Sequence, residues 1–225
     1  MKKFVLAGIL CCSINVLCYV DLQPEFDFYD LISKKATTVS QVEKSLSKVD
    51  KGNLQRLKKN AALSVINGGN LEVFNYLVEG GIIDINALDP YTDANLLFAA
   101  IFFRNDDIAK ALIKAGIDVN YETPEKETAL LEAVHNGTIE MITFLLDSGA
   151  DINHKNTSGT TALRCAIYWR FDIEIVSLLL DRGAKSPFEP IEAKEFLKAH
   201  TNPSQSSIEG ARSEVVQLLK DRNII

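Results

Sequence analysis

Apolar residues recur along this chain in short helical blocks that polar segments separate. In residues 139–148 they recur at intervals of three and four, the spacing that places side chains on one face of a helix. A block at 128–136 precedes this stripe, with Thr128 as its expected N-cap, and Gly149 follows as an expected left-handed stop. The pattern predicts two short helices, a tight turn between them, and then an extended polar loop. The stripe consists of Ile139, Ile142, Leu145 and Leu146.

The same block returns with a period of 33 residues. Because several independent positions agree on this period, the chain is predicted to be an array of one stacked structural unit. A weaker copy at 60–73 aligns with 128–141. The clearest matches are 128–130 with 161–163, Ala133 with Ala166, Gly116 with Gly149, and 118–120 with 151–153.

Two units carry a family resemblance. The segments Ser148-Gly149-Ala150-Asp151-Ile152-Asn153, 159–166 and 173–184 resemble the ankyrin repeat. The resemblance implies an all-α, helix-turn-helix solenoid of about four recognisable repeats with degenerate capping helices at both ends.

The chain also departs from the family pattern. Ala129 and Ala162 stand where the family has Pro, and Leu131 and Arg164 stand where it has His, so weaker hydrogen bonding is expected at the helix starts. One extra residue lies between Trp169 and Ile173, which predicts a distorted turn between the helices of that unit.

The resemblance, together with the proline and polar segments that interrupt the helical pattern, predicts four segments. They are a signal peptide (1–20), N-terminal capping helices (21–59), the repeat array (60–187) and a degenerate C-terminal capping unit (188–225). Helices are expected at 26–32 and 39–46 in the first cap, and at 191–200 and 211–219 in the second.

The first twenty residues have the features of an export leader. Lys2 and Lys3 precede an apolar run that Asp21 ends, as in a secretory signal peptide. Cleavage is expected after Ser13 or Cys18. A lipoprotein leader, an uncleaved membrane anchor and a buried N-terminal helix are the alternatives. Export to the periplasm or outside a bacterial cell is the expectation.

Composition and charge restrict the classes of function. The chain has 47% hydrophobic and 24% charged residues, enough apolar material for a sizeable core. Its formal net charge of −6 lacks the basic excess that nucleic-acid binding requires. Three of the four cysteines lie in the first twenty residues, so no disulfide framework is expected in the body of the protein.

Residues with catalytic or metal-binding potential are few. His135, His154 and His200 form none of the usual zinc-ligand spacings, so neither a metal nor a cofactor is expected. Cys165 is a candidate nucleophile only if a base activates it, and a half-buried packing role is the simpler interpretation. No phosphate-binding glycine loop and no nucleophile elbow are present in the sequence.

The ankyrin resemblance also implies which residues face a partner. In that family the projecting loops and the exposed end of each first helix build one concave binding surface, and the two residues before the mid-unit glycine vary with the ligand. Here this surface is expected to be aromatic with an acidic rim, although some rings, Phe102 above all, can instead turn inward to fill gaps. The helix positions are Phe102, Phe103, His135, Asn136, Tyr168 and Trp169, and the loop positions are Tyr91, Thr92, Glu125, Lys155 and Thr157.

The sequence thus predicts a non-catalytic module that clamps a protein partner in a concave groove. A narrower version is a periplasmic inhibitor or immunity protein whose acidic groove covers a basic active site. Two other classes stay open: a membrane-tethered structural protein that keeps its leader, and a hydrolase built on Cys165 or a pair of carboxylates. The expected partner is an unidentified protein, without nucleic acid or a small-molecule cofactor.

Overall fold

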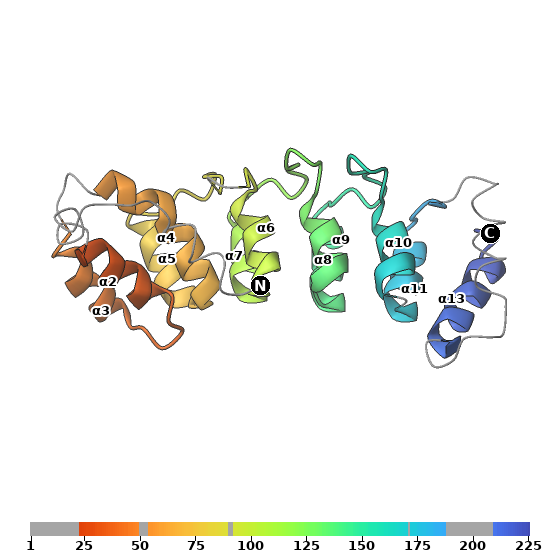
Figure 1. Ribbon diagram of the computed structural model, residues 1–225, viewed down its shortest axis with the longest axis horizontal. Coiled ribbons are helices and arrows are strands. Elements are labelled where there is room, and N and C mark those ends of the chain that lie inside the picture. The colour runs from red at the N-terminus through yellow and green to blue at the C-terminus, as the bar shows by residue number, and fades with distance from the viewer. Residues whose placement is uncertain (1–22, 50–53, 90–91, 171, 188–208) are drawn as a thin grey trace, which may run out of the picture. The chain divides into compact units, whose positions relative to one another are not determined.

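The computed structural model describes residues 23–49, 54–89, 92–170, 172–187 and 209–225, and over these ranges the chain is all-α (Figure 1). Within them the only β-type pairing is an isolated bridge between Leu88 and Asn95. Contacts divide the chain into two compact units that meet in sequence at Ile83 and Asp84. The prediction of an all-α helical array is confirmed.

The first unit contains four helices. They are α2 (Gln23–Ile32), α3 (Val39–Leu46), α4 (Leu54–Gly68) and α5 (Leu71–Glu79). Helix α2 packs against α3 and α4, and α5 packs against α3 and α4. Two of these helices lie where the sequence predicted 26–32 and 39–46, while their role as a cap stays a prediction.

Side-chain caps fix two of the helix starts in this unit. Thr38 and Gln41 form a reciprocal capping box at the start of α3. Asn70 caps α5 and also donates through Nδ2 to the carbonyl oxygens of Lys35 (3.0 Å) and Thr37 (2.7 Å). One buried amide therefore ties α5 to the loop between α2 and α3.

The second unit repeats a pair of helices. The first members are α6 (Leu96–Phe102), α8 (Ala129–Asn136) and α10 (Ala162–Cys165), the last continued by η2 (Ala166–Arg170). The second members are α7 (Asp106–Lys114), α9 (Ile139–Asp147) and α11 (Ile173–Asp181), and α13 (Glu209–Asp221) packs on α11. Helix α8 contacts α6 on one side and α10 on the other, so the first members form one row (Figure 1).

Helix starts and ends in the second unit follow the sequence closely. Asn95, Thr128 and Thr161 each accept a backbone N–H at the start of a first helix. Gly149 follows α9 with φ of 90°, the left-handed conformation expected of it. The expected N-cap and C-terminal stop of the unit at 128–149 are both confirmed.

The buried stripe of α9 shares only Ile142 and Leu145 with the predicted one. Met141, Ile142 and Leu145 are fully buried, whereas Ile139 and Leu146 are only half-buried. The contacts of α9 with α8 and α11 shift its buried face toward Met141. The small residues predicted to allow close helix approach are all buried: Ala129, Ala133, Ala162 and Ala166.

The inserted residue of the last repeat is accommodated within the first helix. After Cys165 the backbone winds as a π-helix over Ala166–Arg170, and α11 then starts normally with Asp172 as its cap. A π-turn takes one more residue than an α-turn, so it absorbs an insertion without breaking the helix. The distortion was predicted for the turn between the two helices, and it is found instead at the end of the first helix, over Ala166–Arg170.

Several expectations fall outside the described residues. These are the leader at 1–20 and the helix expected at 191–200, whereas the helix expected at 211–219 is present as part of α13. In the described ranges, every helix is too short or too polar to cross a lipid bilayer.

Candidate functional site: the exposed row of first helices

The row formed by α6, α8 and α10 presents residues that the sequence predicted to face a partner. Large exposed apolar side chains are few among the described residues: Leu88, Phe102 and Tyr168. Phe102 is 51% exposed and Tyr168 is 38% exposed, and they lie 66 residues apart, twice the repeat period. The equivalent position of the middle helix is the exposed His135. Exposure therefore recurs at one position of three successive helices.

Phe102 and Phe103 form an aromatic pair at the end of α6. Their rings meet edge to face with centroids 5.4 Å apart, an attractive geometry for aromatic side chains. The half-buried ring is Phe103, so the alternative in which Phe102 turns inward to fill a gap is wrong. The reason is that Phe103 is the C-cap residue of α6, where the chain bends back toward α7.

Tyr168 lies on the π-helix beside a basic residue of α10. The guanidinium carbon of Arg164 is 5.3 Å from the centre of the Tyr168 ring, within cation–π range. Arg164 also donates through Nη1 to the carbonyl oxygen of Pro187 (3.4 Å). The backbone of Trp169 belongs to η2, but its side chain lies outside the described part of the structure.

One residue of this row was missed by sequence reasoning. Glu132 lies in α8 with its side chain half-buried, and its carboxylate accepts a hydrogen bond from Asn136 Nδ2 (2.7 Å). Desolvation by burial is the main cause that raises its pKa, and the nearby Glu127 carboxylate adds to the effect, while Asn136 and His135 oppose it. The repeat contained a signal, because one period away lie the small residues Ala99 and Cys165.

The predicted loop residues lie in different surroundings. The backbone N–H of Thr157 donates to the carbonyl oxygen of Glu125 (3.0 Å), so two adjacent loops touch at these residues. Thr92 donates to the carboxylate of Asp89 within its own loop, and Lys155 is exposed. Tyr91 lies outside the described residues. That all these positions, together with the helix positions, contact a partner stays a prediction.

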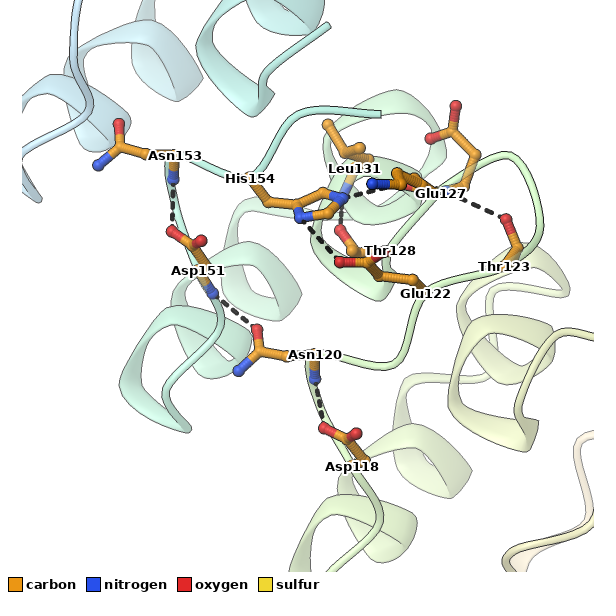
Figure 2. Close-up of polar contacts among 11 residues, drawn as sticks. Asp118, Asn120, Glu122, Thr123, Glu127, Thr128, Leu131, Asp151, Asn153 and His154 are labelled. Carbon is orange, nitrogen blue, oxygen red and sulfur yellow. Dashed lines mark hydrogen bonds and ion pairs between the residues drawn. The ribbon is translucent and has the colours of Figure 1, made fainter. Parts of the chain in front are cut away.

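Asp-x-Asn motifs hold successive loops together (Figure 2). In each motif the Asp carboxylate accepts the backbone N–H of the Asn two residues later, as Asp118 does from Asn120 and Asp151 from Asn153, both at 2.9 Å. The Asn side chain contacts the next repeat: Asn153 Oδ1 accepts the backbone N–H of Lys185 (2.8 Å). These contacts fix the spacing of the loops that flank the exposed row.

His154 has a structural position between two loops (Figure 2). Its Nε2 lies 2.8 Å from the carbonyl oxygen of Lys126, and its Nδ1 lies 3.6 Å from a carboxylate oxygen of Glu122. The imidazole side chain is only 15% exposed. This histidine bridges neighbouring loops.

The surroundings of the candidate nucleophile, Cys165, do not favour a reactive thiol. Cys165 is buried, not half-buried as expected, because it is packed in α10 at the contact with α8. Reactive thiols are partly exposed and lie near positive charge. Within the described ranges, no three His, Cys, Asp or Glu side chains come together as metal ligands would.

A model of ankyrin repeats in three copies matches residues 33–123 and 118–187 of the chain. The chain belongs to the ankyrin repeat family. The match begins at Ser33, directly after α2, inside the segment that the sequence analysis assigned to an N-terminal cap. Ankyrin repeats serve as protein-binding modules, and this chain has the fold of such a module.

Curated relatives share parts of the repeat array. A putative ankyrin repeat-containing protein of Treponema pallidum is 28% identical over 152 residues, 66% of this chain and 50% of the relative. A putative ankyrin repeat protein of fowlpox virus is 33% identical over 123 residues, 54% of this chain and 27% of the relative. A serine/threonine-protein kinase of Arabidopsis thaliana is 34% identical over 99 residues, 43% of this chain and 21% of the kinase. The chain thus spans half or less of these relatives' lengths.

Proposed function

We propose that the second unit binds a protein partner across the row of α6, α8 and α10, without catalysing a reaction. The observation that carries this proposal is the recurrence of exposed aromatic side chains, Phe102 and Tyr168, at the same position of the repeat. Aromatic residues in solvent reduce solubility, and they are the side chains that most often dominate protein interfaces.

The surroundings of the aromatic residues support the same proposal. Tight packing of α8 between α6 and α10 presents a rigid surface, which limits the conformational entropy lost on binding. Asp-x-Asn contacts such as that between Asn120 and Asp151 hold the flanking loops at fixed spacing. The chemistry at Cys165 gives the hydrolase hypothesis no support, since the thiol is buried.

We also propose that the protein acts after export. The support is the sequence pattern at its start, where Lys2 and Lys3 precede an apolar run that ends before Asp21. The intact mass and cell fraction of the native product test this proposal. A product that keeps its first twenty residues in a membrane fraction contradicts export with cleavage and favours the tethered alternative.

The binding proposal is tested by cross-linking in the native host with photoreactive residues at chosen surface positions. A probe at position 102 or 168 is expected to give one dominant protein adduct. Probes at the exposed Glu140 and Glu174, on the second row of helices, serve as controls and are expected to give none. Equal adducts from both rows would contradict the assignment of the surface.

Alanine variants then measure the contribution of the rings. Phe102→Ala and Tyr168→Ala are each expected to weaken binding of the captured partner by about tenfold or more, the effect of an interface hot spot. Because Phe102 and Tyr168 are exposed, both variants should keep the melting temperature of the parent protein. Loss of folding in both would show that the rings are core residues.

A further inference from the structure

Glu132 lies at the centre of the exposed row, between two aromatic positions. Its helix, α8, contacts α6, which carries Phe102, and both α10 and its continuation η2, which carries Tyr168. On its own helix, one turn further along, lie the exposed His135 and the half-buried Asn136. At the equivalent positions of the flanking helices, Ala99 and Cys165 are buried and carry no charge.

The carboxylate of Glu132 is incompletely compensated. Over the described residues, its one hydrogen bond comes from Asn136 Nδ2, and no lysine or arginine forms an ion pair with it. Burial is the main cause that raises its pKa, and the Glu127 carboxylate adds to the effect, while the Asn136 hydrogen bond and the nearby His135 oppose it. An added cation with hydrogen-bond donors would supply the missing compensation.

The charge of the neighbouring loops favours a cation as the ligand. The loops next to α8 carry a net negative charge, because the carboxylates outnumber the two lysines. The carboxylates are Asp84, Asp89, Asp93, Asp118, Glu122, Glu125, Glu127 and Asp151, and the lysines are Lys126 and Lys155.

We propose that Glu132 anchors a lysine or arginine side chain of the protein partner, with an adjacent apolar residue of that partner against Phe102 or Tyr168. This inference rests on the proposed binding function and adds the chemistry of the partner: a basic segment with an apolar neighbour. The acidic loops attract such a segment, and Glu132 forms the specific, desolvated contact.

The test uses a defined probe, a display library of random peptides selected on the full chain. Selection on the wild-type protein is expected to enrich peptides with a lysine or arginine beside an apolar residue. Selection on Glu132→Gln should keep the apolar residue and lose the basic one. Glutamine preserves the acceptor for Asn136, so this variant is expected to fold, and a thermal melt verifies it. Glu174→Gln, the same change at an exposed site on α11, is the matched control.

A double-mutant cycle with one selected peptide completes the test. Replacing its basic residue by norleucine should weaken binding to the wild-type protein and to Glu174→Gln by about tenfold, a typical loss for a charge-assisted contact. The same replacement should cost less than about twofold on Glu132→Gln. An equal loss on all three proteins overturns the proposed contact.

Phe102→Ala separates failure of this inference from failure of the binding proposal. If Phe102→Ala abolishes peptide binding while Glu132→Gln leaves the basic preference unchanged, the surface is correct and the assigned anchor is wrong. If neither variant changes binding of the selected peptides, the proposed surface is wrong as well.

Discussion

Asn120 and Asp151 join two successive repeats through one side chain. Asn120 Oδ1 accepts the backbone N–H of Asp151 (2.8 Å), and the same amide donates through Nδ2 to the carbonyl oxygen of Gly149 (2.9 Å). The two backbone groups belong to the segment that leaves α9. One amide therefore satisfies both a donor and an acceptor of the neighbouring unit, because a side-chain amide carries an acceptor oxygen and a donor NH2 group.

Loss of this bridge is expected to lower stability. Asn120→Ala removes two hydrogen bonds, each worth about 0.5–1.5 kcal/mol net, so the free energy of unfolding should fall by about 1–3 kcal/mol. Asn120→Asp keeps the acceptor and loses the donor to Gly149, so it should also destabilise. Urea denaturation measures both variants. Asn75→Ala, at an exposed site on α5, is the control and should cause no loss; equal stability of all variants would contradict the bridging role.

Two glycines should respond differently to substitution by alanine. Gly149 has φ of 90° and no atom within 4 Å of an added Cβ, so Gly149→Ala should cost about 1–2 kcal/mol through backbone strain alone. At Gly137 an added Cβ would lie 2.6 Å from the carbonyl oxygen of Ala133, so the backbone at the end of α8 must shift to relieve a clash. Thermal melts should therefore rank Gly137→Ala as the more damaging change. The reverse order would contradict the tight turn between α8 and α9.

Buried leucines in the second row of helices should dominate stability. Leu145 and Leu179 are fully buried, and replacing either by alanine should lower the free energy of unfolding by about 2–5 kcal/mol. Leu146→Ala, one position along α9 and half-buried, is the matched control with a smaller expected loss. Denaturant titrations give the comparison. Losses below about 0.5 kcal/mol at both buried sites would show that the repeat register is wrong.

The stability effect of Glu132 should depend on pH. Its pKa is raised in the folded protein, so the folded state holds this proton more tightly than the unfolded chain does. The carboxyl group therefore costs stability as pH rises through its unfolded pKa, and the full cost is present above its folded pKa. Glu132→Gln should stabilise the protein more at pH 7 than near pH 4, as measured by urea unfolding at both values. An advantage independent of pH would contradict a desolvated carboxylate.

Trp169, the single tryptophan, provides a local optical signal. The repeat register places it next to Tyr168 on the partner-facing row, so its fluorescence in the free protein should be accessible to a soluble quencher. Partner binding should protect it, and Trp169→Ala should weaken binding while preserving the melting transition. Blue-shifted, protected emission in the free protein, together with unfolding of Trp169→Ala, would assign the ring to the core.

Much of the fold follows from the sequence because the determinants are local and repeated. The spacing of apolar residues in 139–148 predicts α9, and Thr128 predicts the start of the preceding helix, α8. Gly149 predicts the left-handed residue that ends α9. Each of these depends on contacts within a few residues, and the 33-residue period supplies independent copies. The family could be inferred from the same repeated positions, while the row of ligand-facing positions stays a prediction.

The tertiary structure decided matters that depend on neighbouring helices. Contacts of α9 with α8 and α11 made Met141 a core residue in place of Ile139, and the bend after α6 partly buried Phe103 and exposed Phe102. The sequence located an inserted residue but not its accommodation as a π-turn, since a helix and a loop can both absorb one residue. The desolvation of Glu132 also required the structure, because burial of a side chain is set by helices 33 residues away in either direction along the chain.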